Sequence, residues 1–505
     1  MLRPLASSFY FLVLVHCVRA SPASKRQAPP GRVVALASLN GQNYVNKGLV
    51  GFGLIPSDFR ESTGDTIGGF GSAIDIKYGS LKASGGKFQG TFIVVPDRGY
   101  NVIEPVDYQS RIHEIDFTLT PYYGSAKLNF TAAQKTLSVT YKKTILSYER
   151  LTKKTSGLTP LAVREKQIGY PLVAFSDPEM PIASSDSPRL TIDAEGVVSN
   201  PDGRQESLCS YWLSDEYGPY IFRFTSGGDL IQTIQPPNAF LPRDANGALN
   251  FTSEAVPKTG RTGNQGFEGL TLDRKNQVLY AMLQSATIQD GGDTKNTNRH
   301  TRLVAYDVSR VSVRPKLIGE WVVPLPQSSK GKTYACSEIR YVSPGVFLAL
   351  ARDGDGRGGG DNKSGYKQAD LFTINGATDI HGTKYDDPAN PVSPGGVLDP
   401  AITPATYVPF VDYLNSSELA RFGLHNGSPN DQTLIDAKWE SFALASVNEP
   451  EFPDDYFLFT VADNDFISTN GVSLGVPYDA GLDVDNQFLV FRVTLPGASK
   501  VQIGV

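Results

Sequence analysis

The chain has 505 residues, with 47 Lys and Arg, 52 Asp and Glu and 5 His, for a formal net charge of −5. This acidic balance argues against a nucleic-acid partner, because nucleic acids are bound by basic faces. The 3 cysteines include no Cys-x-x-Cys pair, which argues against a thiolate metal site.

The N-terminal residues have the features of a secretory precursor. Residues 1–20 begin basic, continue with a short apolar core and end at the small residue Ala20, so we predict a signal peptide there. The dibasic pair Lys25-Arg26 predicts a propeptide over 21–26, and the loss of residues 1–26 takes the net charge to −9. No second apolar run is long enough to cross a membrane, so we expect a secreted, extracellular protein without a transmembrane segment.

Sequons and cysteines fit the same secretory route. Cys209 and Cys336 remain after the signal peptide, so one disulfide is possible, with two buried free thiols as the alternative. A fifth sequon, at Asn426, is weakened by Pro429. The four sequons at which we predict N-glycosylation are Asn129, Asn250, Asn362 and Asn415.

Residues 27–505 are expected to form a single all-β domain. Their apolar runs are short, rich in Val, Ile, Phe and Tyr, and separated by Gly and Pro, which is typical of strands. The main helical candidate is 412–424. One serine motif, Gly-Val-Ser473-Leu-Gly, matches a nucleophile elbow, but no His follows His425, so a loop is the better interpretation.

The strands are organised as a repeat. Each unit has three or four strands, and such sheets bury both faces only when they pack radially, which predicts a β-propeller. Residues 32–56 can supply a sixth blade or close the ring, so we favour six blades, with five or seven also compatible. A two-sheet sandwich is the rival fold. The five units begin near Gly71, Asp193, Gly266, Ser337 and Trp439.

Carboxylates recur at two positions of these units, in the first strand and at the end of the second. First strands line the channel of a propeller, so the recurrence predicts a ring of carboxylates around one axis. Crowded carboxylates repel each other in a low dielectric, which favours a bound hard cation with oxygen ligands, Ca²⁺ before Mg²⁺. The expected metal ligands are Asp97, Asp193, Glu195, Asp215, Glu338, Asp353, Glu440, Asp463 and Asp465.

The ordered motifs resemble the phytase-like family, also described as the esterase-like activity of phytase domain. The resemblance spans roughly 65–495 and implies a β-propeller that hydrolyses phosphoric esters. Lys-Trp-Glu-Ser departs from the usual Lys-Ile-Glu-Gly, and Ser72 stands where other units carry an acid. The motifs are Asp-Ala-Glu-Gly (193–196), Ser-Asp-Glu-Tyr-Gly-Pro (214–219), Asn-Gln-Gly-Phe-Glu-Gly (264–269), Ala-Arg-Asp (351–353), Ala-Thr-Asp-Ile (377–380), Lys-Trp-Glu-Ser (438–441) and Asp-Asn-Asp-Phe (463–466).

The chemistry that we expect is metal-assisted hydrolysis of a small phosphorylated or other ester substrate by a monomer. Arg98, Arg352 and Lys438 would stabilise the developing charge, and Glu216 or Glu268 would take the proton. Two alternatives stay open: a metal-dependent propeller hydrolase of another ester or lactone, and a non-catalytic extracellular binding propeller.

Overall fold

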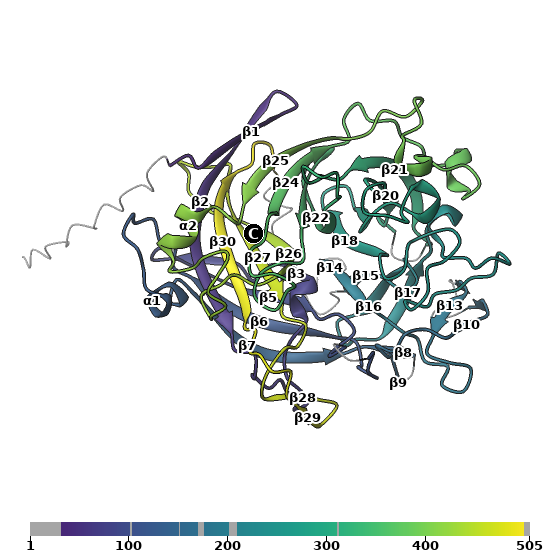
Figure 1. Cartoon of the computed structure of the whole chain (residues 1–505), viewed down its shortest axis with the longest axis horizontal. Helices are drawn as coiled ribbons and strands as arrows, with labels where there is room; N and C mark the ends of the chain where they lie inside the picture. Colours follow the sequence, from purple (N-terminus) through teal and green to yellow (C-terminus); the bar gives the residue numbers. More distant parts are fainter. Residues whose placement is uncertain are drawn as a thin grey trace, which may run out of the picture.

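The computed structural model describes residues 32–101, 104–150, 152–169, 176–200, 210–310 and 313–498. The predicted signal peptide and propeptide lie outside these ranges. Within them, five sheets of four or five strands each follow one another around a common axis, as Figure 1 shows. The predicted β-propeller is therefore confirmed, and it has five blades in the described part of the chain.

Four blades are built from strands that follow one another in the chain, and the first strand named in each is the one nearest the axis. The first contains β3 (Ala73–Ile76), β5 (Lys87–Val95), β6 (Arg111–Leu119) and β7 (Leu137–Leu146), with β4 (Lys82–Ser84) paired to β5. The second contains β14 (Ala194–Asn200), β15 (Ser210–Asp215), β16 (Ile221–Thr225) and β17 (Leu230–Ile234). The third contains β18 (Phe267–Asp273), β19 (Val278–Leu283), β20 (His300–Asp307) and β21 (Lys316–Pro324). The fourth contains β22 (Ala335–Ser343), β23 (Val346–Arg352), β24 (Lys367–Thr373) and β25 (Thr406–Asp412).

The fifth blade joins the two ends of the chain. Strand β2 pairs antiparallel with β30, from Val45 opposite Thr494 to Ile55 opposite Asn486. Residues 32–56 therefore close the ring instead of forming the sixth blade that we favoured. The strand order is β26 (Lys438–Ser446), β27 (Asp455–Asp463), β30 (Asn486–Thr494), β2 (Gln42–Ile55) and β1 (Ala35–Leu39).

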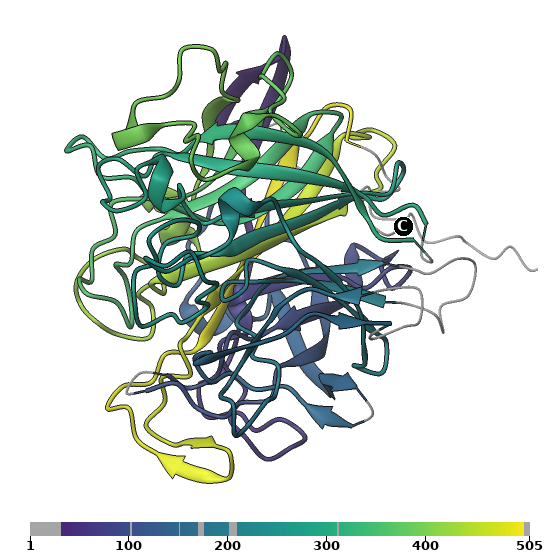
Figure 2. The same ribbon diagram turned by 90° about the vertical axis from the view of Figure 1, so that its right-hand side faces the viewer.

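Short elements decorate the blades. Helix α2 (Ser416–Arg421) lies inside the predicted helical segment, and the hairpin of β28 (Gly471–Ser473) and β29 (Val476–Tyr478) carries Ser473. That serine sits in a hairpin that projects from the body (Figure 2), which confirms the loop interpretation. In the described residues no helix is long and apolar enough to cross a membrane. The other elements are α1 (Phe130–Gln134), β8 (Tyr148–Arg150), β9 (Lys153–Lys154), β10 (Ala162–Arg164), β11 (Gln167–Ile168), β12 (Ser176–Asp177) and β13 (Met180–Ile182).

The blade strands are apolar on both faces because each blade packs between two others. In β27 the consecutive residues Tyr456, Phe457, Leu458 and Phe459 are all fully buried. A strand covered on both sides needs a continuous run of bulky β-formers, whereas a strand with one wet face would alternate. These uninterrupted apolar runs explain why the sequence pattern identified strands readily.

The innermost strands β3, β14, β18, β22 and β26 contact one another in sequence around the axis, in the middle of Figure 1. A buried ion-pair cluster joins three of these strands. The Asp75 carboxylate on β3 pairs with Arg340 of β22 and, at 2.8 Å, with Arg274, which follows β18. Ser199 N on β14 donates to the same carboxylate at 2.9 Å. The axial wall is therefore tied together by charge as well as by packing.

Candidate metal and catalytic site

A cavity of about 170 Å³ lies where the innermost strands begin. Its wall is mostly charged, and it gathers ten of the fourteen residues predicted to act as ligands or catalytic groups, with Asp463 beside it. We call it the axial cavity. It is lined by Asp97, Arg98, Asn101, Asp193, Glu195, Glu216, Asn264, Glu268, Gln284, Arg352, Lys438, Glu440 and Asp465.

Three of its carboxylates are placed by the same backbone irregularity. The strand register shifts at Glu195 in β14, at Glu268 in β18 and at Glu440 in β26, so each is an extra residue in its strand. A β-bulge turns the extra side chain out of the regular alternation, and such bulges are common beside active sites. Here they turn one carboxylate per blade toward the axis.

The glycines that follow two of these glutamates are required by close strand contacts. A Cβ at Gly196 would lie 2.8 Å from Glu268 O, and a Cβ at Gly269 would lie 2.8 Å from Ile339 N. Any larger residue would force neighbouring innermost strands apart. The Glu-Gly pair therefore places a carboxylate in the cavity while the next residue permits close packing around it.

Glu338 does not reach the cavity, although it was predicted as a ligand. In β22 the register shifts at Ser337, so Ser337 takes the position that a glutamate has in the other bulges. Glu338 Oε1 instead accepts hydrogen bonds from Leu270 N at 3.0 Å and Ile339 N at 2.8 Å. The predicted ligand position was off by one residue, and a shift of one residue moves a side chain to the other face of a strand.

Asp215 and Asp353 are also held outside the cavity. Asp215 accepts from Asp193 N at 2.8 Å and Gly218 N at 2.7 Å, so it fixes the backbone beside the site. Burial raises the pKa of Asp215 to about 7. Asp353 accepts from Ser364 Oγ and Gly365 N, both at 2.6 Å, and thereby closes the glycine-rich loop after β23.

The ends of the second strands form another part of the wall. The backbone N–H groups of Asp97, Glu216 and Gln284 each donate to a carbonyl that lies just before or within the first strand of their own blade, at 3.3, 3.0 and 3.0 Å. The same backbone geometry thus presents side chains of different chemistry in successive blades. Only the acids among them were identified as site residues from the sequence.

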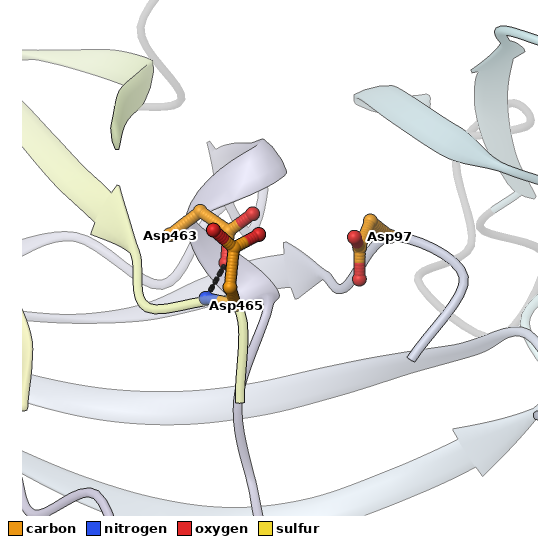
Figure 3. A group of neighbouring side chains, drawn as sticks. All are labelled: Asp97, Asp463 and Asp465. Atoms are coloured by element: carbon orange, nitrogen blue, oxygen red, sulfur yellow. Dashed lines mark hydrogen bonds between the residues drawn. The ribbon is translucent and has the colours of Figure 1, made fainter. Parts of the chain in front are cut away.

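One cluster of carboxylates already holds a cation of the protein. Asp97, Asp463 and Asp465 have ligand atoms within 4.8 Å of one another, and Figure 3 shows Asp97 facing the two others. Lys438 Nζ lies 2.7 Å from Asp463 Oδ2 and 2.7 Å from Asp465 Oδ1. Burial opposes the charge of Lys438, but Asp463 and Asp465 raise its pKa well above its usual range.

In a second cluster of carboxylates, less of the negative charge is compensated by nearby positive side chains. Asp193, Glu195 and Glu216 also have ligand atoms within 4.8 Å of one another. Both carboxylate oxygens of Asp193 and Oε1 of Glu216 are buried without a hydrogen-bond partner, although Arg98 Nη1 lies 3.4 Å from Asp193 Oδ2. Burial, then the carboxyls of Glu268 and Glu216, raise the pKa of Glu195 well above its usual range. A divalent cation would relieve this repulsion.

The other charged side chains of the cavity interact with one another or with amide side chains. Arg352 donates to Glu440 Oε1, and Arg98 Nη1 donates to Asn264 Oδ1 at 2.8 Å. Gln284 Nε2 donates to Glu268 Oε1, while Glu268 Oε2 is buried without a partner. Burial, then the neighbouring Glu216 carboxyl, raise the pKa of Glu268 well above its usual range.

Asn101, Asn264 and Gln284 line the cavity but were not among the predicted site residues. For Asn264 a signal existed, because it begins the Asn-Gln-Gly-Phe-Glu-Gly motif. Gln284 occupies the repeat position of Glu216, so alignment of the units could have included it. Asn101 follows β5 in an irregular segment and has no repeat partner to reveal it.

Among the described residues, none of the predicted glycosylation or disulfide sites is part of the cavity wall. Cys336 is a buried free thiol on β22 whose Sγ lies 3.3 Å from Glu338 O, so the structure gives no support to a disulfide, and Cys209 lies outside the described residues. Burial raises the pKa of the Cys336 thiol well above its usual range. The sequon Asn129 is exposed, and Asn250, Asn362 and Asn415 are half-buried.

Comparison with known proteins agrees with the axial motifs. The model of the phytase-like family, described as esterase-like activity of phytase, matches residues 78–411. An uncharacterized secreted protein of Arthroderma benhamiae is 36% identical over 482 residues, which cover 87% of this chain and 91% of that protein. The chain belongs to the phytase-like family.

Similarity to solved structures is weak. A glycosyl hydrolase from Bacteroides ovatus gives a TM-score of 0.30 at 11% identity, covering 89% of this chain and 96% of that one. A GH62 α-L-arabinofuranosidase catalytic domain from Coprinopsis cinerea gives a TM-score of 0.32 at 9% identity, covering 88% and 97% of the two chains. The assignment of the chain to the phytase-like family therefore rests on the sequence matches.

Proposed function

We propose that this protein is a secreted, metal-dependent hydrolase of phosphoric esters and that the axial cavity is its active site. The observation that carries the proposal is the cluster of Asp193, Glu195 and Glu216, three buried carboxylates with converging oxygens. Unpartnered buried carboxylate oxygens fit a hard cation, which favours Ca²⁺ over Mg²⁺ as the resident metal. Family membership favours phosphoric esters as substrates.

Asp193, Glu195 and Glu216 would hold the cation, rather than the cluster around Asp97, because Lys438 already occupies the latter. A bound divalent cation supplies polarisation of a phosphoryl group and neutralises the field that would otherwise repel an anionic substrate. This assignment makes the two carboxylate clusters unequal, and it places Glu216, which the sequence suggested as a proton acceptor, among the ligands.

The chain's own residues orient the ester around that position. Arg98 and Arg352 both line the cavity and can donate to the non-reacting phosphate oxygens. Glu268 is close enough to Glu216 for that carboxyl to raise its pKa, and Gln284 Nε2 donates to Glu268 Oε1. Its free oxygen, Oε2, is the position from which a proton can be exchanged with the attacking or leaving oxygen.

Phosphate release from p-nitrophenyl phosphate and from phytate, with EDTA and with added Ca²⁺, tests the proposal. We expect release only with the metal, and about a hundredfold loss of kcat/KM in Glu195→Gln, since carboxylate substitutions in and around metal sites cost this much or more. Glu338→Gln is the matched control, with the same chemical change in another innermost strand and outside the cavity. A folded wild-type protein that releases no phosphate in any condition would contradict the proposal.

Two other results would favour the alternatives. Hydrolysis of p-nitrophenyl acetate or of a lactone without phosphate release would favour an ester or lactone hydrolase. Stabilisation by Ca²⁺ without turnover of any ester would favour a binding propeller whose metal is structural.

Secretion is part of the proposal and has its own test. The named secreted relative and the predicted signal peptide support it. Expression in a eukaryotic host should yield protein in the medium that begins at Gln27 and loses mass with an N-glycosidase. Retention inside the cell with an intact N-terminus would contradict it.

A further inference from the structure

A cavity of about 380 Å³ lies between the first blade, where β6 begins and β7 ends, and the hairpin of β28 and β29. We call it the hairpin cavity. Among the described residues, none lines both this cavity and the axial cavity, so the chemistry proposed for the axial cavity does not use it. Its volume lies within the range of about 300–1,000 Å³ that is typical of small-molecule sites.

A buried guanidinium group has an unused edge in this wall. Arg111 is only 3% exposed, and its Nη1 lies 2.5 Å from Glu61 Oε1 and 3.5 Å from Asp65 Oδ2. Its Nε donates to Gln109 O at 3.0 Å, and its Cζ lies 4.0 Å from the ring centre of Tyr108, which holds the plane of the group. Among the described residues, Nη2 has no hydrogen-bond partner. This nitrogen is therefore a fixed donor for a ligand in the cavity.

A lysine adds a charge that no carboxylate of the wall compensates. Lys154 lines the cavity, is exposed, and forms no ion pair within the described ranges. The exposed acid of the wall is engaged elsewhere, because Asp107 Oδ2 pairs with Arg189 at 2.5 Å and Asp107 Oδ1 accepts from Ser156 Oγ at 2.8 Å. A free ammonium group and a fixed guanidinium edge in one wall favour an anion, and a carboxylate fits the guanidinium well.

Neutral polar groups in the same wall suit hydroxyl groups. Thr155 Oγ1 and Gln109 Nε2 both donate to Ser147 O, at 3.2 and 2.8 Å, so both side chains are held in place. The Thr155 hydroxyl can still accept a hydrogen bond, and Gln109 Oε1 has no partner in the part of the chain that the structure describes. Each of them offers an acceptor to the hydroxyl group of a ligand.

A leucine in an unfavourable backbone conformation forms the outer side of the cavity. Leu474 and Gly475 are the two-residue turn of the hairpin, with φ of 53° and 75°. Positive φ at both positions favours Asn-Gly and disfavours leucine. Asp65 Oδ1 accepts from Gly475 N at 3.1 Å, which anchors this turn on the cavity. Leu474 is 45% exposed, and with Leu146 it gives the cavity an apolar side.

We propose that the hairpin cavity binds a small hydroxylated carboxylic acid, of which a uronic acid is the example. Its carboxylate contacts the two cations, its hydroxyl groups contact the two neutral polar side chains, and its apolar face lies on the two leucines. The inference does not depend on the proposed function, because the two cavities are separate. The six side chains are Gln109, Arg111, Leu146, Lys154, Thr155 and Leu474.

D-Glucuronate and D-glucose share a ring and most of its hydroxyl groups and differ by the carboxylate. In calorimetric titrations of the wild type we expect glucuronate to bind at least about tenfold more tightly than glucose, as charge-assisted hydrogen bonds to one anion allow. Lys154→Ala should weaken glucuronate binding about tenfold and leave glucose binding as it is. Lys87→Ala removes an exposed lysine elsewhere on the first blade and is the control. Equal binding of both sugars by the wild type, no binding of glucuronate, or an unchanged affinity in Lys154→Ala overturns the proposal.

A second pair of variants tests the apolar side. Leu474→Gly keeps the turn, since glycine adopts positive φ freely, and removes the side chain. We expect it to weaken glucuronate and glucose by the same factor, about fivefold, because the ring face is common to both sugars. Val476→Ala shortens the neighbouring exposed side chain of the hairpin, which is not in the wall, and should bind like the wild type. Wild-type affinity for glucuronate in Leu474→Gly would place the ligand elsewhere and refute the proposed site.

Discussion

Asp75 and Arg340, from two innermost strands that are not neighbours in the ring, form a buried ion pair across the axis of the propeller. Asp75 also holds Arg274, so one carboxylate compensates two guanidinium groups. The pair therefore ties blades together at a place where apolar packing is interrupted.

Asp75→Asn should destabilise the fold strongly. The change removes the carboxylate charge that both buried guanidinium groups share, and breaking a buried ion pair costs about 3–5 kcal/mol. Urea unfolding monitored by tryptophan fluorescence would measure the loss. Lys142→Ala is the control: it removes an exposed lysine that pairs with Asp116 and with Glu114, which keeps Lys77 and Lys143, and it should change the free energy of unfolding by less than about 1 kcal/mol. A similar small effect for both variants would show that the axial pair is dispensable.

Lys438→Met should create a second cation site. Its removal leaves Asp97, Asp463 and Asp465 crowded and uncompensated, so in EDTA we expect a loss of about 3–5 kcal/mol in the free energy of unfolding. Added Ca²⁺ should then raise the melting temperature of the variant more than that of the wild type, since a ligand at a hundredfold excess over its Kd adds about 2.7 kcal/mol per site. Differential scanning calorimetry with Lys142→Met as control would show the difference. Equal calcium shifts would contradict it.

Asp370 should make stability depend on pH. It is fully buried on β24, and burial raises the pKa of this carboxyl from its ordinary 3.8 to about 7. The folded protein keeps a proton that the unfolded chain has lost, so the stabilisation is full below about pH 4 and disappears as pH rises through about 7. Asp370→Asn cannot ionise. Relative to the wild type, it should gain about 3 kcal/mol between pH 5 and pH 8 in urea unfolding, and a constant difference would refute the assignment.

Gly269→Ala should disturb the site through the backbone. The added methyl group would lie 2.8 Å from Ile339 N, and overpacking of this kind costs about 1–3 kcal/mol. Because Glu268 precedes it at the bulge, kcat/KM should fall as well. Gly227→Ala, whose Cβ would meet nothing closer than 3.7 Å, serves as the control. Normal activity and stability in Gly269→Ala would contradict the packing argument.

The sequence revealed the propeller and most of the axial carboxylates because both repeat. Strands buried on two faces leave uninterrupted apolar runs, and Glu195, Glu268 and Glu440 recur at the same position of their units, where each strand has a bulge. Ser337 broke the motif, and the adjacent Glu338 was taken in its place, since no sequence pattern shows where a bulge shifts the register. The number of blades could not be read because β2 pairs with β30, a contact between the two ends of the chain.

The pairing of chain ends in the fifth blade also sets when the axial cavity can form. Asp193, Glu195 and Glu216 are synthesised early, whereas Lys438 and Glu440 belong to the last blade, and β30 must emerge before β2 has its partner. A nascent chain therefore carries open strand edges and an incomplete cavity until β30 has been synthesised. A chain cut short before β30 leaves β2 without its neighbour and the cavity without its closing blade.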